Sequence, residues 1–222
     1  MLAYKFLSAG AVAPFTGRPW PLPGPRAPGA WIFAPPGDLA RYGVHACRME
    51  DLSYWLDEEL WLVELGEPIV PTPFHVAAGR GRLLQRITAW NAASAREYAA
   101  ACAWRARDLV AEALSRAALD AEASALRACI DLVSLQATAT AIAGDAARDE
   151  PRGLVAYAAG AALRARQGRF PEASLQCAHL GAALTGSEAG AGCERAWQAR
   201  WLAHRLELRE IAARSGVGAF PV

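Results

Sequence analysis

The residue types best suited to chemistry lie close together in the segment 43–47 (GVHAC) and just after it. If His45 and Cys47 occupy a strand, their side chains point to the same face. A histidine beside a cysteine can lower the pKa of the thiol and so activate it as a nucleophile. Glu50 or Glu59 could then orient the imidazole. These four residues form the candidate catalytic site of one hypothesis, an enzyme that works in a cleft between an N-terminal part and a helical bundle.

The same segment also fits a purely structural interpretation. In that interpretation Gly43 makes a turn, His45 is satisfied by a backbone carbonyl in a half-buried strand, and Cys47 is a buried, inert thiol. The sequence contains no G-x-G-x-x-G, Walker, H-E-x-x-H or G-x-S-x-G motif, so nucleotide, zinc-protease and serine-hydrolase chemistry lack their usual anchors. A third hypothesis is a cofactor held by His45 or His204. His75 is expected to face solvent.

A metal site is the other chemistry that histidine and cysteine support. His45 and Cys47, together with Cys177 and His179, would supply two thiolates and two imidazoles, a set that zinc accepts. Cys177 and His179 fall inside a predicted helix, however, where side chains two residues apart point about 200° away from each other. They cannot bind one ion there. We therefore predict no metal site and no bound cofactor.

Composition restricts the class of protein. The chain has 222 residues, 54% of them hydrophobic, and a formal net charge of +1; of its 23 basic residues only Lys5 is a lysine. The apolar fraction is sufficient for a buried core, and the near-neutral balance argues against nucleic acid or an anionic membrane as the partner. The arginines of segment 80–107, interleaved with Trp90 and Trp104, are expected to be solvated or paired rather than to bind RNA.

Cysteine usage and hydropathy indicate a cytoplasmic protein. Five cysteines are spread along the chain without a C-x-x-C pair, which fits reduced thiols better than a secreted disulfide framework. The uncharged stretch 132–144 is too short for a transmembrane helix, which needs about 20 apolar residues. The segment 1–10 has a weak apolar run and is soon followed by Pro14, so we expect no signal peptide.

The elements that must position these residues fall into two parts of different composition. Eleven of the 14 prolines lie between Pro14 and Pro73, which excludes long helices there. The rest of the chain is rich in Ala, Leu, Arg and Glu, which favour helices. We therefore predict a Pro-rich strand and loop domain over residues 1–75 and an Ala/Arg-rich helical bundle over residues 76–222, with the boundary near 71–78.

The first part is predicted to hold short strands at residues 3–7, 31–33 and 60–66. Trp61, Val63 and Leu65 of the last strand alternate onto one face. One or two helical turns are expected at 50–56.

About six helices are predicted in the remaining two thirds, over residues 81–90, 94–118, 120–144, 151–168, 171–186 and 193–214. Ser94 and Glu97 form a capping box for the second helix, and Asp120 can cap the third. Pro151 is tolerated in the first turn of the fourth. Helices of this length, joined by short loops, pack as an antiparallel bundle or as stacked hairpins.

Two resemblances to other proteins can be stated. With its segment 43–47, the pair Tyr54-Trp55 and the strand 60–64, the chain resembles uncharacterised bacterial and phage proteins that share a Gly-x-His-x-Cys turn, an aromatic pair and a Val-Glu strand. That resemblance implies no activity. The helices between Arg82 and Leu184 are similar in texture to the helical immunity proteins of toxin systems.

These observations predict an α+β protein, in which a small Pro-rich, strand-containing N-terminal part packs on a C-terminal antiparallel helical bundle. The leading hypothesis is a non-catalytic intracellular binding, scaffold or accessory protein, of immunity type in one version. A protein partner or a second copy of the chain is expected, with a small-molecule ligand as the alternative. Neither nucleic acid nor a membrane is expected as a partner. The competing hypothesis is the enzyme built on His45, Cys47, Glu50 and Glu59.

Overall fold

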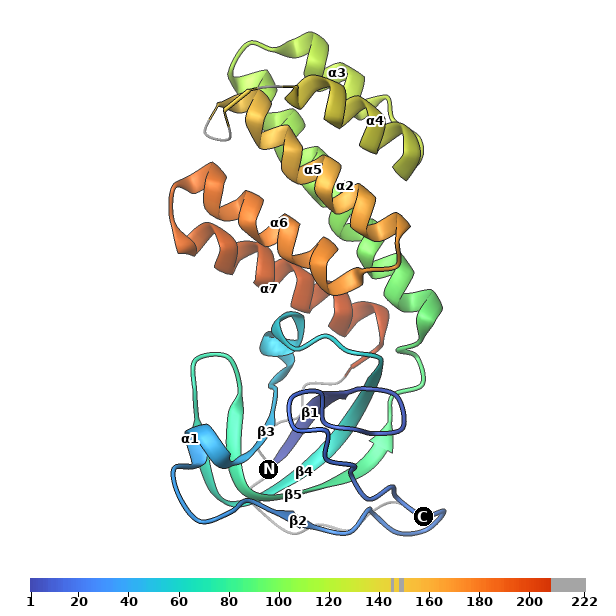
Figure 1. The fold of residues 1–222 in the computed structure, drawn as a ribbon, viewed down its shortest axis with the longest axis vertical. Coiled ribbons are helices and arrows are strands. Elements are labelled where there is room, and N and C mark those ends of the chain that lie inside the picture. The colour runs from blue at the N-terminus through green and yellow to red at the C-terminus, as the bar shows by residue number, and fades with distance from the viewer. Residues whose placement is uncertain (145, 148–149, 209–222) are drawn as a thin grey trace. The chain divides into compact units, whose positions relative to one another are not determined.

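The structure is a computed structural model that describes residues 1–144, 146–147 and 150–208 (Figure 1). It confirms the α+β class, because the first part of the chain forms an antiparallel sheet and the second forms helices. The chain divides into two compact units. One unit contains residues 1–91 and the described residues from Leu202 onward, and the other runs from Ala92 to Trp201.

In its described residues the N-terminal unit is built on five strands and two short helical segments. The strands are β1 (Leu2–Leu7), β2 (Ile32–Phe33), β3 (Val44–Ala46), β4 (Glu59–Pro71) and β5 (Val76–Arg86). The helical segments are α1 (Leu39–Tyr42) and the 3-10 helix η1 (Met49–Tyr54). Strands were predicted close to β1, β2 and β4, and helical turns close to η1, so these predictions are confirmed.

The sheet of this unit closes on itself. Its strands run in the order β1-β4-β5-β2, and β3 also pairs with β5. Tyr4 in the middle of β1 exchanges two backbone hydrogen bonds with Cys47, the residue after β3, at N···O distances of 2.9 and 2.7 Å. Strand β1 is therefore bonded to β4 on one side and to the end of β3 on the other.

The core of the N-terminal unit lies on the inner face of this closed sheet. Ala3 and Leu7 of β1 are buried in it together with Trp61 and Val63 of β4. Lys5 lies between the two β1 residues and stands opposite Trp61 in the strand register. Because side chains alternate along a strand, Lys5 is directed to the same inner face as these apolar residues.

The helix predicted at residues 81–90 is wrong, because most of that segment belongs to strand β5. Strand β5 pairs with β4 and also with β2 and β3, and this tertiary pairing outweighs local helix propensity. Gly81 shows how closely the strands approach, since a Cβ atom there would lie 2.7 Å from Cγ1 of Val44.

Because β5 belongs to the sheet, the observed boundary between the two units differs from the predicted one. The boundary predicted near residues 71–78 falls within the hairpin of β4 and β5. The observed division lies between Asn91 and Ala92, so the N-terminal unit is larger than the sequence indicated.

The second unit is a helical bundle, as predicted. In the described residues its helices are α2 (Ala92–Arg116), α3 (Asp120–Arg127), α4 (Leu132–Ala143), α5 (Pro151–Arg166), α6 (Phe170–Thr185) and most of α7 (Glu188–Arg205). Helix α2 packs against α5 and α6, and α5 also packs against α4. The buried positions of the bundle are mostly alanine and leucine, so the helices pack closely. No helix in the described ranges is both long and apolar enough to span a bilayer.

Some helix ends follow the sequence signals and others do not. Pro151 begins α5 and Gly186 ends α6, as predicted, and the structure shows Gly186 in the left-handed conformation. The single helix predicted at 120–144 is instead two helices, α3 and α4. The reason is a second cap, because the Asp131 carboxylate accepts a hydrogen bond from the backbone N–H of Ser134 at 2.7 Å and starts a new helix.

Two further helix starts differ from expectation. Helix α2 begins at Ala92, so Ser94 lies inside the first turn and is not the N-cap. Helix α7 begins at Glu188, before the expected start at Cys193, and the expected end near 214 lies outside the described residues.

Candidate functional site

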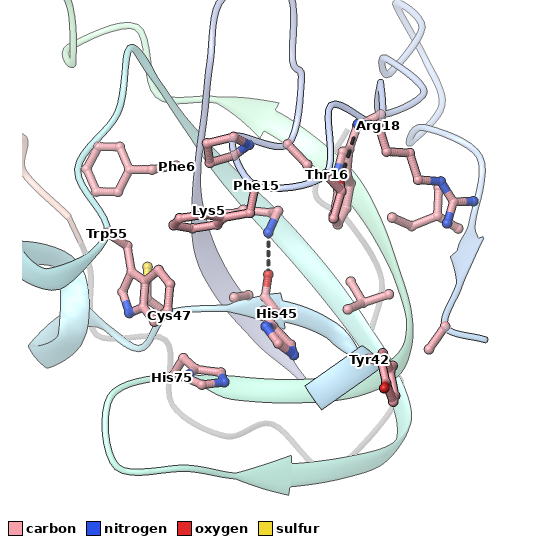
Figure 2. Close-up of a pocket in the computed structure, with 18 of the residues that line it drawn as sticks. Lys5, Phe6, Phe15, Thr16, Arg18, Tyr42, His45, Cys47, Trp55 and His75 are labelled. Carbon is pink, nitrogen blue, oxygen red and sulfur yellow. Dashed lines mark hydrogen bonds between the residues drawn. The ribbon is translucent and has the colours of Figure 1, made fainter. Parts of the chain in front are cut away.

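The N-terminal unit contains a cavity of roughly 740 Å³, shown in Figure 2. Its walls come from β1 and the loop after it, the segment from β2 through β3, the end of η1, and His75 just before β5. Small-molecule sites in proteins are clefts of about 300–1,000 Å³ lined mainly by apolar and aromatic side chains. The cavity matches that description in size and in lining.

Several of the side chains that line the cavity are exposed aromatic residues. Phe15, Phe33, Tyr42 and Tyr54 all line the cavity, and their exposed fractions are 84%, 60%, 48% and 37%. Phe74 stacks beside Tyr54 with ring centroids 4.6 Å apart. Large aromatic side chains contribute most when buried, and an exposed apolar patch of this kind marks a binding surface. We refer to these five residues as the aromatic rim.

A continuous row of rings leads from the rim into the cavity. The centroid distances are 6.2 Å from Phe15 to Trp55, 5.2 Å from Trp55 to His75 and 4.7 Å from His75 to His45. The indole N–H of Trp55 donates to the carbonyl oxygen of Phe74 at 2.7 Å, which fixes the middle of the row. A planar ligand can therefore contact the edges and the faces of these rings.

A tight turn presents Phe15 at the rim. The backbone N–H of Gly17 donates to the carbonyl oxygen of Ala13 at 2.9 Å, and the N–H of Ala13 donates to that of Arg18 at 2.9 Å. Gly17 has φ +65°, a conformation that glycine adopts without strain. The turn is therefore fixed by its own backbone, and Phe15 projects from it without being held by the core.

The two histidines of the row contact each other through their rings, and each keeps one ring nitrogen without a hydrogen-bond partner in the described structure. Nε2 of both His45 and His75 is buried and has no hydrogen-bond partner among the residues described by the structure. Burial lowers the pKa of each imidazole below 6.5, which favours the neutral rings. The expectation that His75 faces solvent is wrong, because its ring is half-buried between Trp55 and His45.

Lys5, the only lysine of the chain, also lines the cavity. Its Nζ donates to the carbonyl oxygen of His45 at 2.5 Å (Figure 2). The same atom lies 5.2 Å from the ring centroid of Trp20. Within the described part of the chain, no carboxylate forms an ion pair with this ammonium. Burial lowers the pKa of Lys5 to about 8, because desolvation disfavours the charged form.

Cys47, the candidate nucleophile, is held as a buried thiol. Its Sγ donates to the carbonyl oxygen of Tyr4 at 3.2 Å, and burial raises the pKa of the thiol to about 12. Since the ring of His45 turns toward His75, no hydrogen bond joins this imidazole to the thiol in the described structure. The structure thus brings both residues to the cavity wall, but in an arrangement that does not favour the thiolate.

The two candidate carboxylates are engaged elsewhere. The Glu59 side chain is buried and accepts hydrogen bonds from the backbone N–H of Ala11 at 3.1 Å and from the indole N–H of Trp61 at 3.0 Å. Glu50 is exposed and forms an ion pair with Arg48 at 3.3 Å. Neither residue lines the cavity, so the structure does not join them to His45.

The histidines and cysteines considered for a metal or a cofactor do not form a metal cluster in the described residues. No cluster of three or more His, Cys, Asp or Glu side chains suitable for a metal occurs in the described ranges. His204, the second cofactor candidate, is exposed near the end of α7. His45 lies in the cavity wall, where its unpartnered Nε2 can accept or donate a hydrogen bond to a ligand.

Comparison with known proteins identified no similar protein. No protein-family model, no curated protein and no solved structure matches this chain. The resemblances noted from the sequence therefore stay predictions, and the geometry of the cavity carries the functional argument.

Sequence reasoning missed two residues of this site, and each had a local signal. Lys5 alternates with Ala3 and Leu7, so a strand there must turn it toward the apolar face. Phe15 stands between Pro14 and Gly17, a pattern typical of a tight turn with an exposed tip.

Proposed function

We propose that this chain is a non-catalytic binding protein and that its N-terminal unit takes a small planar aromatic molecule into the cavity. The observation that carries the proposal is the aromatic rim around a cavity of small-molecule size. A folded protein normally buries large aromatic side chains in its core. Their exposure in and beside the cavity is explained if a ligand covers them.

The ring row supports a planar aromatic ligand over a flexible aliphatic one. Aromatic rings prefer offset-stacked or edge-to-face contacts with centroids about 4.5–7 Å apart. Phe15 and Trp55 already meet edge to face, with an interplanar angle of 89°. A flat ring entering beside them can contact one by its face and the other by its edge.

The state of the candidate nucleophile supports binding over catalysis. A thiol that donates to a backbone carbonyl and has a pKa of about 12 is almost entirely protonated at neutral pH. The carboxylates that would orient a catalytic histidine are engaged elsewhere. The cavity therefore offers side chains that can bind a ligand, but its cysteine is not activated as a nucleophile. A protein partner for the helical unit stays a prediction.

The proposal is tested with N-phenyl-1-naphthylamine, a neutral aromatic probe whose fluorescence rises in apolar sites. We expect saturable binding to the full chain and a weakening of about fivefold in Phe15→Ala, equivalent to about 1 kcal/mol of lost ring contact. The matched control is Ile130→Ala, because Ile130 is 89% exposed and lies in the helical unit.

The outcomes separate clearly. Weakened binding in Phe15→Ala with wild-type binding in Ile130→Ala supports the cavity as the site. Equal binding by both variants and the wild type, or no saturable binding at all, would refute the proposal.

A further inference from the structure

We infer that the ligand of this cavity carries an anionic group, such as a carboxylate, sulfonate or phosphate, and that Lys5 is the residue that binds it. The inference rests on the proposed function and names the chemical class of its ligand. It is argued from the position of Lys5, from the charges around it and from its incomplete hydrogen bonding.

The position of Lys5 is unusual for a structural residue. Strand alternation turns it to the inner face beside Ala3 and Leu7, where an apolar side chain would complete the core. Lysine is rarely buried unless it is paired, and removing an ammonium from water without a partner costs free energy. A bound anion supplies the missing partner.

Lys5 has hydrogen-bonding capacity left for a ligand. An ammonium group has three N–H donors. One of them is used by the carbonyl oxygen of His45, and the Trp20 ring lies at 5.2 Å as an aromatic neighbour. Lys5 is half-buried and lines the cavity, so a remaining donor can reach an acceptor that enters it.

The other charged groups of the cavity lining do not neutralise Lys5. Among the residues that the structure describes, Asp57 is the only acidic one in the lining. It accepts hydrogen bonds from the hydroxyl of Ser8 and the backbone N–H of Glu58, both at 2.8 Å. Arg18 and Arg41 add positive charge. A cavity with an excess of cations attracts an anionic ligand.

The direct test compares two probes of similar shape and different charge. One is 8-anilinonaphthalene-1-sulfonate, which carries a sulfonate, and the other is the neutral N-phenyl-1-naphthylamine. We expect the wild-type chain to bind the sulfonate at least about fivefold more tightly than the neutral probe. In Lys5→Met the sulfonate affinity is expected to fall about tenfold, with neutral-probe affinity within about twofold of wild type.

Two matched variants complete the design. Arg96→Met also removes one positive charge but lies on the exposed surface of α2, so both probes should bind it as they bind the wild type. Lys5→Arg keeps the charge and should retain part of the preference for the sulfonate. Equal losses for both probes in Lys5→Met, or a wild-type chain without preference, would overturn the inference. Loss of neutral-probe binding in Phe15→Ala still reports on the proposed function alone.

A pH titration of the wild-type chain tests the inference without any substitution. Above about pH 8 Lys5 loses its proton, and binding of an anion moves this loss to somewhat higher pH. The titratable groups facing Lys5 are His45, His75 and Cys47, and their pKa values are displaced away from this range, below 6.5 for the histidines and to about 12 for the thiol.

The sulfonate affinity should therefore fall toward that of the neutral probe between about pH 8 and about pH 10. Arg18, Arg41 and Asp57 also line the cavity, and the ratio of the two affinities cancels changes that affect both probes alike. A ratio that stays constant over this range would contradict the inference. Because this titration uses the wild-type chain, it remains a valid test if Lys5→Met does not fold.

Discussion

The imidazole rings of His45 and His75 lie 4.7 Å apart between centroids, with their planes inclined at 41°. Burial lowers the pKa of both rings. The neighbouring His45 lowers the pKa of His75 further, and the Lys5 ammonium does the same for His45, against a hydrogen bond with the Leu39 backbone. Two neutral rings can share this place, whereas two imidazolium cations would repel each other and Lys5.

Acidification should therefore destabilise the N-terminal unit. Since both histidines have a lower pKa in the fold than in the unfolded chain, the unfolded chain takes up protons first as the pH falls. Their contribution to stability is complete above 6.5, the reference value, and is lost as the pH falls below it. Arg48 and Asp51 also face His75, with opposite effects on its pKa.

Urea unfolding midpoints measured at about pH 7.5 and about pH 5.5 check this expectation. We expect a lower midpoint at the acidic pH, and a smaller difference between the two in His75→Gln. His179→Gln, an exposed change in α6, should keep the wild-type difference. Identical pH dependence in all three chains would show that the pair does not titrate as described.

Thiol labelling should distinguish a buried structural cysteine from a nucleophile. Cys193 is exposed, whereas Cys47, Cys102 and Cys177 are buried with raised pKa values. Treatment of the folded chain with N-ethylmaleimide near neutral pH, followed by peptide mass spectrometry, should show Cys193 modified first. Rapid and selective modification of Cys47 would instead favour the enzyme hypothesis.

The contact between α6 and α7 should depend on glycine. A Cβ atom at Gly181 would lie 2.5 Å from the carbonyl oxygen of Gly190, and backbone atoms cannot move aside easily. We expect Gly181→Ala to lower the free energy of unfolding by about 2 kcal/mol, in the range of other overpacking changes.

The control for this change lies in α7 itself. No atom of the described residues lies within 4 Å of a Cβ added at Gly192, so Gly192→Ala should be neutral or stabilise the helix by up to about 1 kcal/mol. Urea unfolding of both variants makes the comparison. A destabilised Gly192→Ala with an unaffected Gly181→Ala would contradict the packing described for these helices.

The two candidate carboxylates should differ in their effect on stability. Glu59 accepts hydrogen bonds from Ala11 and Trp61, and its side chain is 9% exposed. Removing it in Glu59→Ala leaves buried donors without acceptors and should cost about 3 kcal/mol. Glu50 is 69% exposed at its side chain, and Glu50→Ala should change the unfolding free energy by about 0.5 kcal/mol or less. Similar losses in both would place Glu59 outside the core.

Local sequence signals predicted the elements that local chemistry determines. The alternation around Trp61 gave β4, and Pro151 and Gly186 gave the ends of two helices. Strand β5 was missed because its identity comes from partners on both edges rather than from its own residues. Gly81 is the clearest case, since its lack of a side chain matters only where Val44 crosses it.

The site was predictable only in part for the same reason. His45 and Cys47 were recognised as chemically capable residues, and they do line the cavity. Their partners lie far away in sequence. His75 reaches His45 only because β3 and β5 pair, and Phe15 reaches Trp55 only through the loop that follows β1. Pairing of distant segments is not encoded in residue spacing.

The two hydrogen bonds between Tyr4 and Cys47 also affect how the protein meets other chains. Unpaired strand edges are templates for intermolecular strand addition and aggregation. Here β1 is bonded on both sides, and β2 and β3 span only two and three residues. A foreign strand therefore finds the middle of β1 already bonded on both sides, so this strand can lie beside an apolar cavity without serving as a template for polymerisation.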